Sequence, residues 1–257
     1  MTAAQPGDSV TYAVVEGVAR VELHRPAVSN AVDLGMATRL ADVVDDIASD
    51  ESVRAVALTG AGACFCAGGD VASMLAADDR GRYVEELAHA LDEALQRLAS
   101  LDKPVVAGVH GAVAGAGLAV MLSCDLVVAG AGTRFVTAYS GVGLTPDCGL
   151  SWLLPRAIGQ QRALEMLLTN RVVAVEQAQG WGLVTETAAD DVVTERAHVV
   201  AATLAAGPSL ALGQARRLLR GSWETTRAEI GADEARTIGR AVQTAEATRL
   251  LERFAKR

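Results

Sequence analysis

The chain has 257 residues, a length that suits one large domain or a domain with a small appendage. Hydrophobic residues make up 51% of it and aromatic residues only 4%, so the core must be built mainly from Ala, Val and Leu. The net charge of -8 and the absence of a basic stripe argue against nucleic acid as a partner.

The N-terminal segment and the cysteines are typical of a cytoplasmic protein. Residues 1–9, MTAAQPGDS, lack the charged start and apolar run of a signal peptide, and no apolar run approaches the roughly 20 residues that span a bilayer. Cys64, Cys66, Cys124 and Cys148 are too few and too irregular for a disulfide framework, and the histidines have no metal-binding spacing. We therefore expect reduced thiols, no metal site and no membrane association.

Strands and helices are predicted to alternate over the first two-thirds of the chain, and the last third is predicted to be helical. Repeated strand–helix–strand units favour a parallel sheet with right-handed crossovers, hence an α/β core over residues 1–190. The predicted elements are a hairpin (12–23), a helix (34–48), a strand (53–59), a short helix (70–77), a charged loop (79–83), a long helix (84–101), strands (105–109, 126–129, 134–137), helices split near Pro155 and Gly159 (152–158, 161–169), a helix (175–181), a strand (183–186) and C-terminal helices (191–205, 209–220, 224–237, 241–256).

Two glycine-rich turns follow predicted strands, at Gly60–Asp70 (GAGACFCAGGD) and at Gly111–Gly117. Turns at the ends of neighbouring parallel strands can direct their backbone N–H groups at one point, and two such donors form an oxyanion hole. The turns do not match a P-loop or a dinucleotide fingerprint, and the chain has no G-x-S-x-G elbow for a serine nucleophile. The pattern favours a substrate carbonyl that gains negative charge, although glycine needed only for packing is an alternative.

Three segments resemble the signature blocks of the crotonase superfamily, the enoyl-CoA hydratase/isomerase family. They are FCAGGDV (65–71), HGAVAGAGLAVMLSCD (110–125) and GLTPDCGLSWLLPRAIG (143–159). HRPAVSNAVD (24–33) and AQGWGLVTE (178–186) resemble further blocks, in the family's order. Within the third block, TPDCGLSWLLPR looks most like the ring-opening 1,2-epoxyphenylacetyl-CoA isomerase branch.

The resemblance implies a ClpP-like spiral of repeated ββα units with a C-terminal helical trimerisation region over residues 191–257. It implies a homotrimer or a dimer of trimers, with an acyl-CoA thioester as substrate and no separate cofactor. The oxyanion amides would be those of Gly69 and Gly117. The CoA moiety would contact mainly the backbone of Val28, Asn30, Ala31, Ala67, Gly68, Asp70 and Val71, and its phosphates would meet Arg249, Lys256 or Arg257.

The chain departs from a hydratase at two positions. Hydratases of this family resemble one another in using two glutamates that hold a water molecule, and Ala119 and Tyr139 stand in their places. The remaining carboxylate is Asp147, which would act as a single proton shuttle in an isomerase. Tyr139 is expected to line the acyl pocket or to donate a hydrogen bond. The alternative for Asp147 is a turn residue that caps the following helix, which is also the role expected of Asp70.

Four functions remain open on the sequence. The favoured one is an enoyl-CoA isomerase that shifts a double bond or rearranges an epoxide ring. A hydratase (lyase) acting on 2-enoyl-CoA is the main alternative. A dehalogenase-like use of Asp147 as a nucleophile lacks a supporting histidine, and a non-catalytic acyl-CoA-binding protein would not need the two oxyanion glycines.

Overall fold

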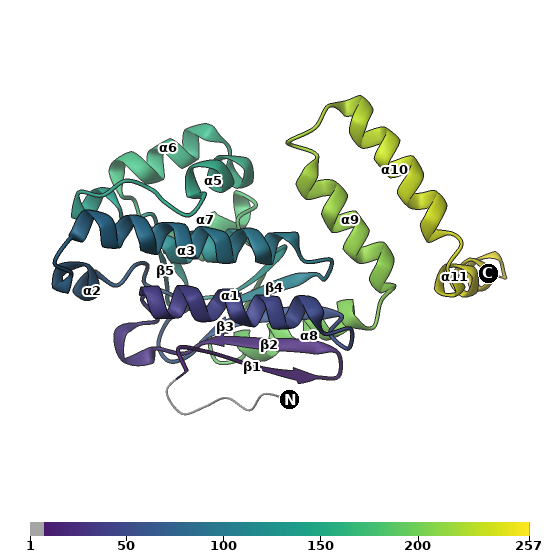
Figure 1. Ribbon diagram of the computed structural model, residues 1–257, viewed down its shortest axis with the longest axis horizontal. Helices are drawn as coiled ribbons and strands as arrows, with labels where there is room; N and C mark the ends of the chain where they lie inside the picture. The colour runs from purple at the N-terminus through teal and green to yellow at the C-terminus, as the bar shows by residue number, and fades with distance from the viewer. Residues whose placement is uncertain (1–7, 257) are drawn as a thin grey trace.

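The main sheet has the strand order β1-β2-β3-β4-β6-β9 in the computed structural model, which describes residues 8–256 (Figure 1). β1 and β2 form the predicted antiparallel hairpin, and the remaining neighbours are parallel. A smaller sheet has the order β5-β7-β8. The strands are β1 Val10–Val15, β2 Val18–Leu23, β3 Ala55–Gly60, β4 Val105–Val109, β5 Ala112–Ala114, β6 Leu126–Gly130, β7 Arg134–Val136, β8 Val173–Ala174 and β9 Glu186–Ala188.

Helices cover both faces of the main sheet (Figure 1). On one face, α1 (Leu34–Ser49) and α3 (Arg80–Ser100) pack side by side and bury their apolar stripes. On the other face lies α8 (Val193–Ala205), whose buried alanines at 197, 201 and 205 let it approach the strands closely. The packed core therefore extends beyond residue 190, while the division into a core and an oligomerisation region stays a prediction.

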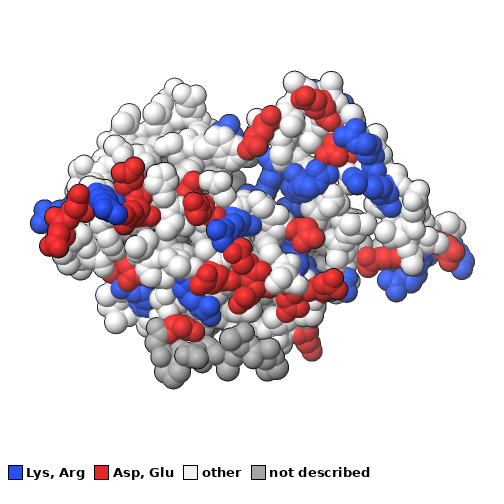
Figure 2. Space-filling view, viewed as in Figure 1, with Lys and Arg blue, Asp and Glu red and all other residues white. Residues whose placement is uncertain are grey.

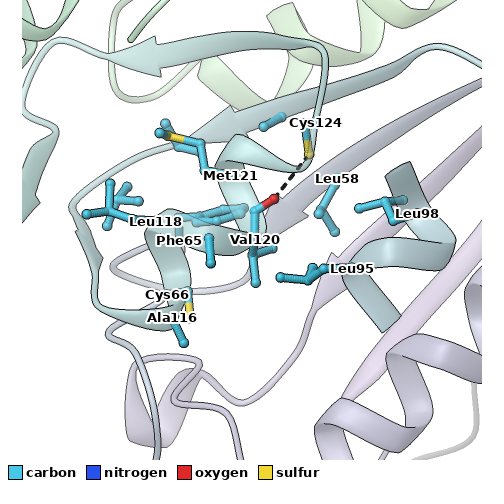
Figure 3. Close-up of a cluster of buried hydrophobic side chains, with 14 of the residues drawn as sticks. Leu58, Phe65, Cys66, Leu95, Leu98, Ala116, Leu118, Val120, Met121 and Cys124 are labelled. Atoms are coloured by element: carbon cyan, nitrogen blue, oxygen red, sulfur yellow. Dashed lines mark hydrogen bonds between the residues drawn. The ribbon is translucent and has the colours of Figure 1, made fainter. Parts of the chain in front are cut away.

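A second group of helices is shorter, and two of them, α4 (Ala116–Leu122) and α7 (Val175–Gly180), contact strands of the smaller sheet. Among them, α4 is enclosed by the core, and Figure 3 shows its Leu118 and Met121 within the same apolar cluster as Phe65 of the first glycine turn. The group comprises α2 Val71–Ala76, α4 Ala116–Leu122, α5 Leu150–Ile158, α6 Gln160–Thr169 and α7 Val175–Gly180, with single 3-10 turns at Pro26–Val28 and Ser140–Val142.

The C-terminal helices α9 (Ser209–Gly221), α10 (Arg227–Ala241) and α11 (Ala245–Ala255) extend away from the core (Figure 1). Arg216 anchors α9: it donates to the carbonyls of Leu98 (2.9 Å) and Ala99 (2.6 Å) and pairs with Asp125 (2.6 Å). Beyond this anchor, the helices expose large apolar side chains, namely Leu219, Ile238, Val242, Leu250, Leu251 and Phe254.

Several details of the predicted elements were wrong, including the start of α10, three residues late, and that of α11, four residues late. Residues 80–83 belong to α3 instead of a loop, because the Asp79 side chain caps the helix by accepting from the Arg82 amide (3.0 Å). Pro155 lies inside α5, so that Gly159, with φ +84°, alone separates α5 from α6. The last strand begins at Glu186, three residues late, and the short strands β5 and β8 were not predicted.

The remaining expectations concern membrane association, metal binding, the cysteines and the two ends of the chain. Within residues 8–256, no helix combines the length and the apolar character needed to cross a membrane. The same residues hold no cluster of three or more metal-ligating side chains. All four cysteines are buried and free. The expectation for residues 1–7 and the contact predicted for Arg257 lie outside the described residues.

Candidate active site

The two glycine-rich turns lie side by side beyond the carboxyl ends of β3 and β4. The Phe65 amide donates to the carbonyl of His110 (2.8 Å), and the Ala114 amide donates to the carbonyl of Cys66 (3.0 Å). These bonds form a short parallel bridge between Cys66 and Val113. The prediction that the turns meet is therefore confirmed.

Glycine is required at two points where the turns touch. A Cβ at Gly117 would lie 2.6 Å from the carbonyl oxygen of Cys66, closer than a carbon atom can approach. Gly68 has φ +105°, a conformation that strains other residues, and a Cβ there would lie 3.1 Å from the carbonyl oxygen of Ala114. Packing alone explains why residue 117 is glycine. Any role of Gly117 in ligand binding would therefore depend on its backbone amide and not on the absence of a side chain.

The backbone amides of Gly69 and Gly117 are the predicted oxyanion donors. On either side of Gly69, the Val32 amide donates to the carbonyl of Gly68 (2.8 Å) and the Asp70 amide donates to the carbonyl of Val32 (2.9 Å). Gly117 is the second residue of α4, where an amide has no acceptor within the helix. In the described part of the chain, no oxygen accepts a hydrogen bond from either amide. Both N–H groups therefore lack a partner among the described residues, and their role as donors to a substrate oxygen stays a prediction.

Asp147, the predicted base, accepts a hydrogen bond from Tyr139. The Tyr139 hydroxyl donates to Oδ1 of Asp147 at 2.6 Å. Tyr139 is only 8% exposed. Its ring lies against the second glycine turn, since a Cβ at Gly115 would be 3.9 Å from Cζ of the ring. The hydrogen bond therefore ties Asp147 to the turn that leads into Gly117.

The side chain of Asp147 does not cap the following helix. The N-cap residue of α5 is Gly149, and among the described residues no side chain bonds to the first amides of this helix. Asp147 contributes only its main-chain carbonyl, which accepts from the Leu150 amide at 2.9 Å. The capping alternative is wrong, because the carboxylate bonds to Tyr139 instead.

The two side chains beside the Asp147 carboxylate stay protonated. Burial raises the pKa of the Tyr139 phenol, and the negative charge of Asp147 raises it further. Burial and the same charge also raise the pKa of the Cys148 thiol. Near neutral pH, Tyr139 is therefore a neutral donor to the Asp147 carboxylate, and Cys148 is a neutral thiol that donates to the carbonyl of Ala88.

The Tyr139 phenol should make the fold less stable at high pH. Its pKa is higher in the folded chain than in the unfolded chain, where it is about 10. Its stabilising contribution is thus complete below that pH and declines as the pH rises above it. Denaturant unfolding at a series of pH values should show this decline, and Tyr139→Phe should reduce it. Equal declines in the two proteins would contradict the assignment.

Arg25, which the sequence did not single out, joins the loops on which CoA is expected to bind. Its guanidinium pairs with Asp33 (2.9 Å) and Asp70 (3.0 Å) and donates to the carbonyl of Ala31. Asp70 also caps α2, as predicted. Burial raises the pKa of Asp70, but hydrogen bonds from Ser73 and Arg25 outweigh it and hold the pKa below its usual value. No local spacing reveals Arg25, because Asp70 is 45 residues away.

Arg25→Gln should destabilise the protein by about 1–3 kcal/mol, because it leaves Asp33 and Asp70 without their cation in a partly buried site. Looser loops should also raise KM for an acyl-CoA more than they lower kcat. Thermal unfolding and steady-state kinetics measure the two effects. Arg82→Gln is the control, since Arg82 forms only an exposed pair with Glu86. Equal effects of the two variants would refute this role of Arg25.

The residues expected to contact CoA differ in accessibility. Val28 and Val71 are exposed, at 42% and 47%. Asn30 is fully buried, and its amide donates to the carbonyls of Ala61 (2.8 Å) and Cys64 (2.9 Å). The side chain of Asn30 therefore clamps its loop to the first glycine turn, and contact with CoA through the surrounding backbone stays a prediction.

A model of the family described as enoyl-CoA hydratase/isomerase matches residues 14–257. The chain belongs to the enoyl-CoA hydratase/isomerase family. It is 36% identical over 242 residues to 1,2-epoxyphenylacetyl-CoA isomerase of Escherichia coli (strain K12), with 91% of each chain covered. It is 33% identical over 213 residues to 4-chlorobenzoyl coenzyme A dehalogenase-2 of Arthrobacter sp, covering 82% of this chain and 77% of the dehalogenase.

The solved structure of an enoyl-CoA hydratase from Mycobacterium smegmatis superposes with a TM-score of 0.91 and 31% identity, covering 98% of this chain and 97% of that one. The likeness confirms the predicted α/β crotonase fold, including the place of the C-terminal helices. Relatives in the enoyl-CoA hydratase/isomerase family carry the names of an isomerase, a hydratase and a dehalogenase, so family membership alone does not select the reaction.

Position 119 is one of the two places where hydratases of this family are expected to carry a catalytic glutamate. Ala119 is 0% exposed, on a helix whose residues 116–121 are all buried. Neither Ala119 nor Tyr139 offers a carboxylate near the turns. Asp147 is a carboxylate tied to the second turn through Tyr139, and among the described residues it forms neither a side-chain helix cap nor an ion pair.

The basic residues predicted to meet CoA phosphates are not brought to the site within one chain of this family member. Arg249 lies on α11, where it pairs with Glu246 at 3.9 Å. Lys256 follows the same helix. Figure 1 places α11 on the opposite side of the molecule from α2, which adjoins Gly69.

A cleft of about 690 Å³ separates α3 and α5 from α9. It reaches Cys148 and Gly149, but none of the predicted site residues lines it. Its rim includes Arg217 and Arg220, and Figure 2 shows basic side chains gathered in this hollow beside the C-terminal helices. The cleft therefore lies next to the predicted site, and the turn at Cys148 and Gly149 separates the two.

Proposed function

We propose that this chain is an enoyl-CoA isomerase, with Asp147 as its single proton shuttle and the amides of Gly69 and Gly117 as its oxyanion hole. The observation that supports it most directly is the Tyr139–Asp147 hydrogen bond of 2.6 Å beside the second glycine turn. This bond fixes the Asp147 carboxylate beside that turn, and Ala119 and Tyr139, at the positions of the two hydratase glutamates, supply no second one. The similarity to an isomerase of Escherichia coli is consistent with this reaction.

The proposed reaction needs one base and one oxyanion site. The two amides bind the thioester oxygen of a 3-enoyl-CoA, and Asp147 removes a proton from C2. The electron pair moves into a dienolate, whose oxygen bears the negative charge and is stabilised by the two N–H donors. Protonated Asp147 then returns the proton to C4, and the double bond lies between C2 and C3. Proton and charge balance without a second acid or a water molecule.

Rearrangement of a ring epoxide whose ring is bonded to C2 of the acyl-CoA is a second substrate option. The same two amides would stabilise the same kind of enolate oxygen, and a single proton shuttle would again suffice. The support for it is the similarity to 1,2-epoxyphenylacetyl-CoA isomerase.

The test is a parallel assay of purified protein with a 3-enoyl-CoA, a 2-enoyl-CoA, 1,2-epoxyphenylacetyl-CoA and 4-chlorobenzoyl-CoA. Formation of conjugated thioester from the first, or consumption of the epoxide, supports the isomerase. Loss of conjugation from the 2-enoyl-CoA by hydration would support the lyase alternative, and chloride release would support a nucleophilic Asp147. Binding of CoA without any turnover would support a non-catalytic role.

We further propose an oligomeric state and a cellular location for the protein. A homotrimer or a dimer of trimers would cover the apolar side chains that α10 and α11 expose. CoA would enter only as part of the substrate, without another cofactor, and the protein would act in the cytoplasm. Sedimentation velocity measures the assembly, and a monomer at micromolar concentration would contradict it.

A further inference from the structure

The Tyr139–Asp147 contact is a short, shielded hydrogen bond. Its O···O distance is 2.6 Å, in the range of about 2.5–2.7 Å that is characteristic of a hydroxyl bonded to a carboxylate. The phenol is 8% exposed, so water competes little for the bond. A carboxylate has two oxygen atoms, and the phenol engages Oδ1. The two oxygens of Asp147 are therefore not equivalent.

The backbone is strained beside both partners. Ala138, directly before Tyr139, has φ +62°, and Cys148, directly after Asp147, has φ +51°. A left-handed conformation costs a residue with a Cβ about 1–2 kcal/mol. Such strain persists where the surrounding structure holds it, and it tends to occur at functional sites. Here the surroundings include the buried Cys148 thiol, which donates to the carbonyl of Ala88 on α3 (3.7 Å).

Both strained residues orient the pair. The conformation of Ala138 precedes the turn in which the Tyr139 carbonyl accepts from the amides of Val142 (3.1 Å) and Leu144 (3.0 Å). Left-handed Cys148 stands between Asp147 and Gly149, the N-cap of α5, and the Asp147 side chain bonds to Tyr139 instead of capping that helix. Two separate segments are thus strained next to the same hydrogen-bonded pair. A residue that only capped a helix would not require strain in both segments.

We propose that Tyr139 is a positioning residue that holds Oδ1 of Asp147 and leaves Oδ2 as the oxygen that moves the proton. This inference rests on the proposed function, because it assigns Tyr139 a part in the chemistry of Asp147. Tyr139 keeps its own proton throughout: it is a neutral donor to the Asp147 carboxylate, and among the described residues its hydroxyl has no hydrogen-bond partner other than Asp147. Tyr139 holds the Asp147 side chain in one rotamer, and its loss should therefore lower kcat.

The experiment compares Tyr139→Phe with the wild type, with Asp147→Asn and with the double variant, on whichever thioester the parallel assay identifies. Tyr139→Phe keeps the ring and removes only the hydroxyl. It should lower kcat by about 10- to 100-fold, since small misplacements of a reacting group have effects of this size. KM and CoA affinity should stay within about two-fold of the wild type. Tyr12→Phe is the matched control, because the Tyr12 hydroxyl also donates to an aspartate, Asp46, at 3.1 Å.

The double variant separates positioning from a general structural effect. If Tyr139 acts through Asp147, adding Tyr139→Phe to Asp147→Asn should cause no further loss of the residual turnover. Three results would overturn the inference: an unchanged kcat in Tyr139→Phe, an equal loss in both backgrounds, or a raised KM with kcat retained. If Asp147→Asn itself keeps wild-type turnover, the proposed function fails first, and this result is distinct from the other three.

Discussion

Asp147→Asn should abolish most turnover, with kcat falling by about 10²- to 10⁴-fold, the usual contribution of a general acid–base group. The amide oxygen of asparagine can still accept the Tyr139 hydroxyl bond of 2.6 Å, so the local geometry should persist. It cannot take up a proton at the pH of the assay. The loss should therefore appear in kcat, while affinity for CoA, measured by calorimetric titration, stays close to that of the wild type.

Asp92→Asn is the matched control for this variant. Asp92 lies on α3 close to the same turn, since a Cβ at Gly149 would be 3.6 Å from its Oδ1, but its carboxylate accepts from Gln96. It should leave turnover unchanged. If Asp147→Asn and Asp92→Asn behaved alike, a general change of charge in this region would explain the data, and Asp147 would lose its assigned role.

Gly117→Ala should cost both stability and activity. The new Cβ would lie 2.6 Å from the carbonyl oxygen of Cys66, and a backbone atom at that distance cannot turn aside. Forcing a methyl group into a packed site typically costs about 1–3 kcal/mol. The two glycine turns would move apart, and because the predicted oxyanion donors lie one on each turn, turnover should fall by about 10²-fold or more. Thermal unfolding and kcat are the measurements.

Gly69→Ala gives the comparison for stability. A Cβ at Gly69 would lie 2.6 Å from Cε of Met74, the mobile end of a flexible side chain that can move away. Its unfolding free energy should therefore change much less than that of Gly117→Ala. Equal destabilisation of the two variants would mean that contact between the turns is not what requires glycine at 117.

The sequence predicted the fold well where one physical signal dominated. The hairpin at 10–23, α1 and α9 follow from clear periodicity and turn residues, and their bounds agree within about two residues. β5 and β8 were missed because three or two residues are too few for a period to appear. The start of α3 was missed because the charged residues after Asp79 resemble a loop, although they form an exposed helical turn behind a cap.

The positions of the backbone turns at the candidate site could be predicted from the sequence, whereas most of its side-chain contacts could not. Glycine patterns locate the two turns, and parallel strand order brings them together. The Tyr139–Asp147 bond depends on left-handed conformations at Ala138 and Cys148, two residue types that do not signal such a backbone. Arg25 was missed for a different reason, since its partner Asp70 is remote in sequence.

Under the proposed isomerase function, the complete burial of Ala119 limits how this chain could acquire a two-glutamate hydratase mechanism during evolution. A glutamate introduced there would carry its charge into an enclosed, apolar helix environment, where desolvation strongly disfavours the ionised form. The second position is filled by a phenol that already bonds to Asp147. Neither single substitution would give a useful intermediate by itself. The route to a two-glutamate enzyme is therefore epistatic, because a carboxylate at position 119 needs other substitutions around it before its ionised form is stable.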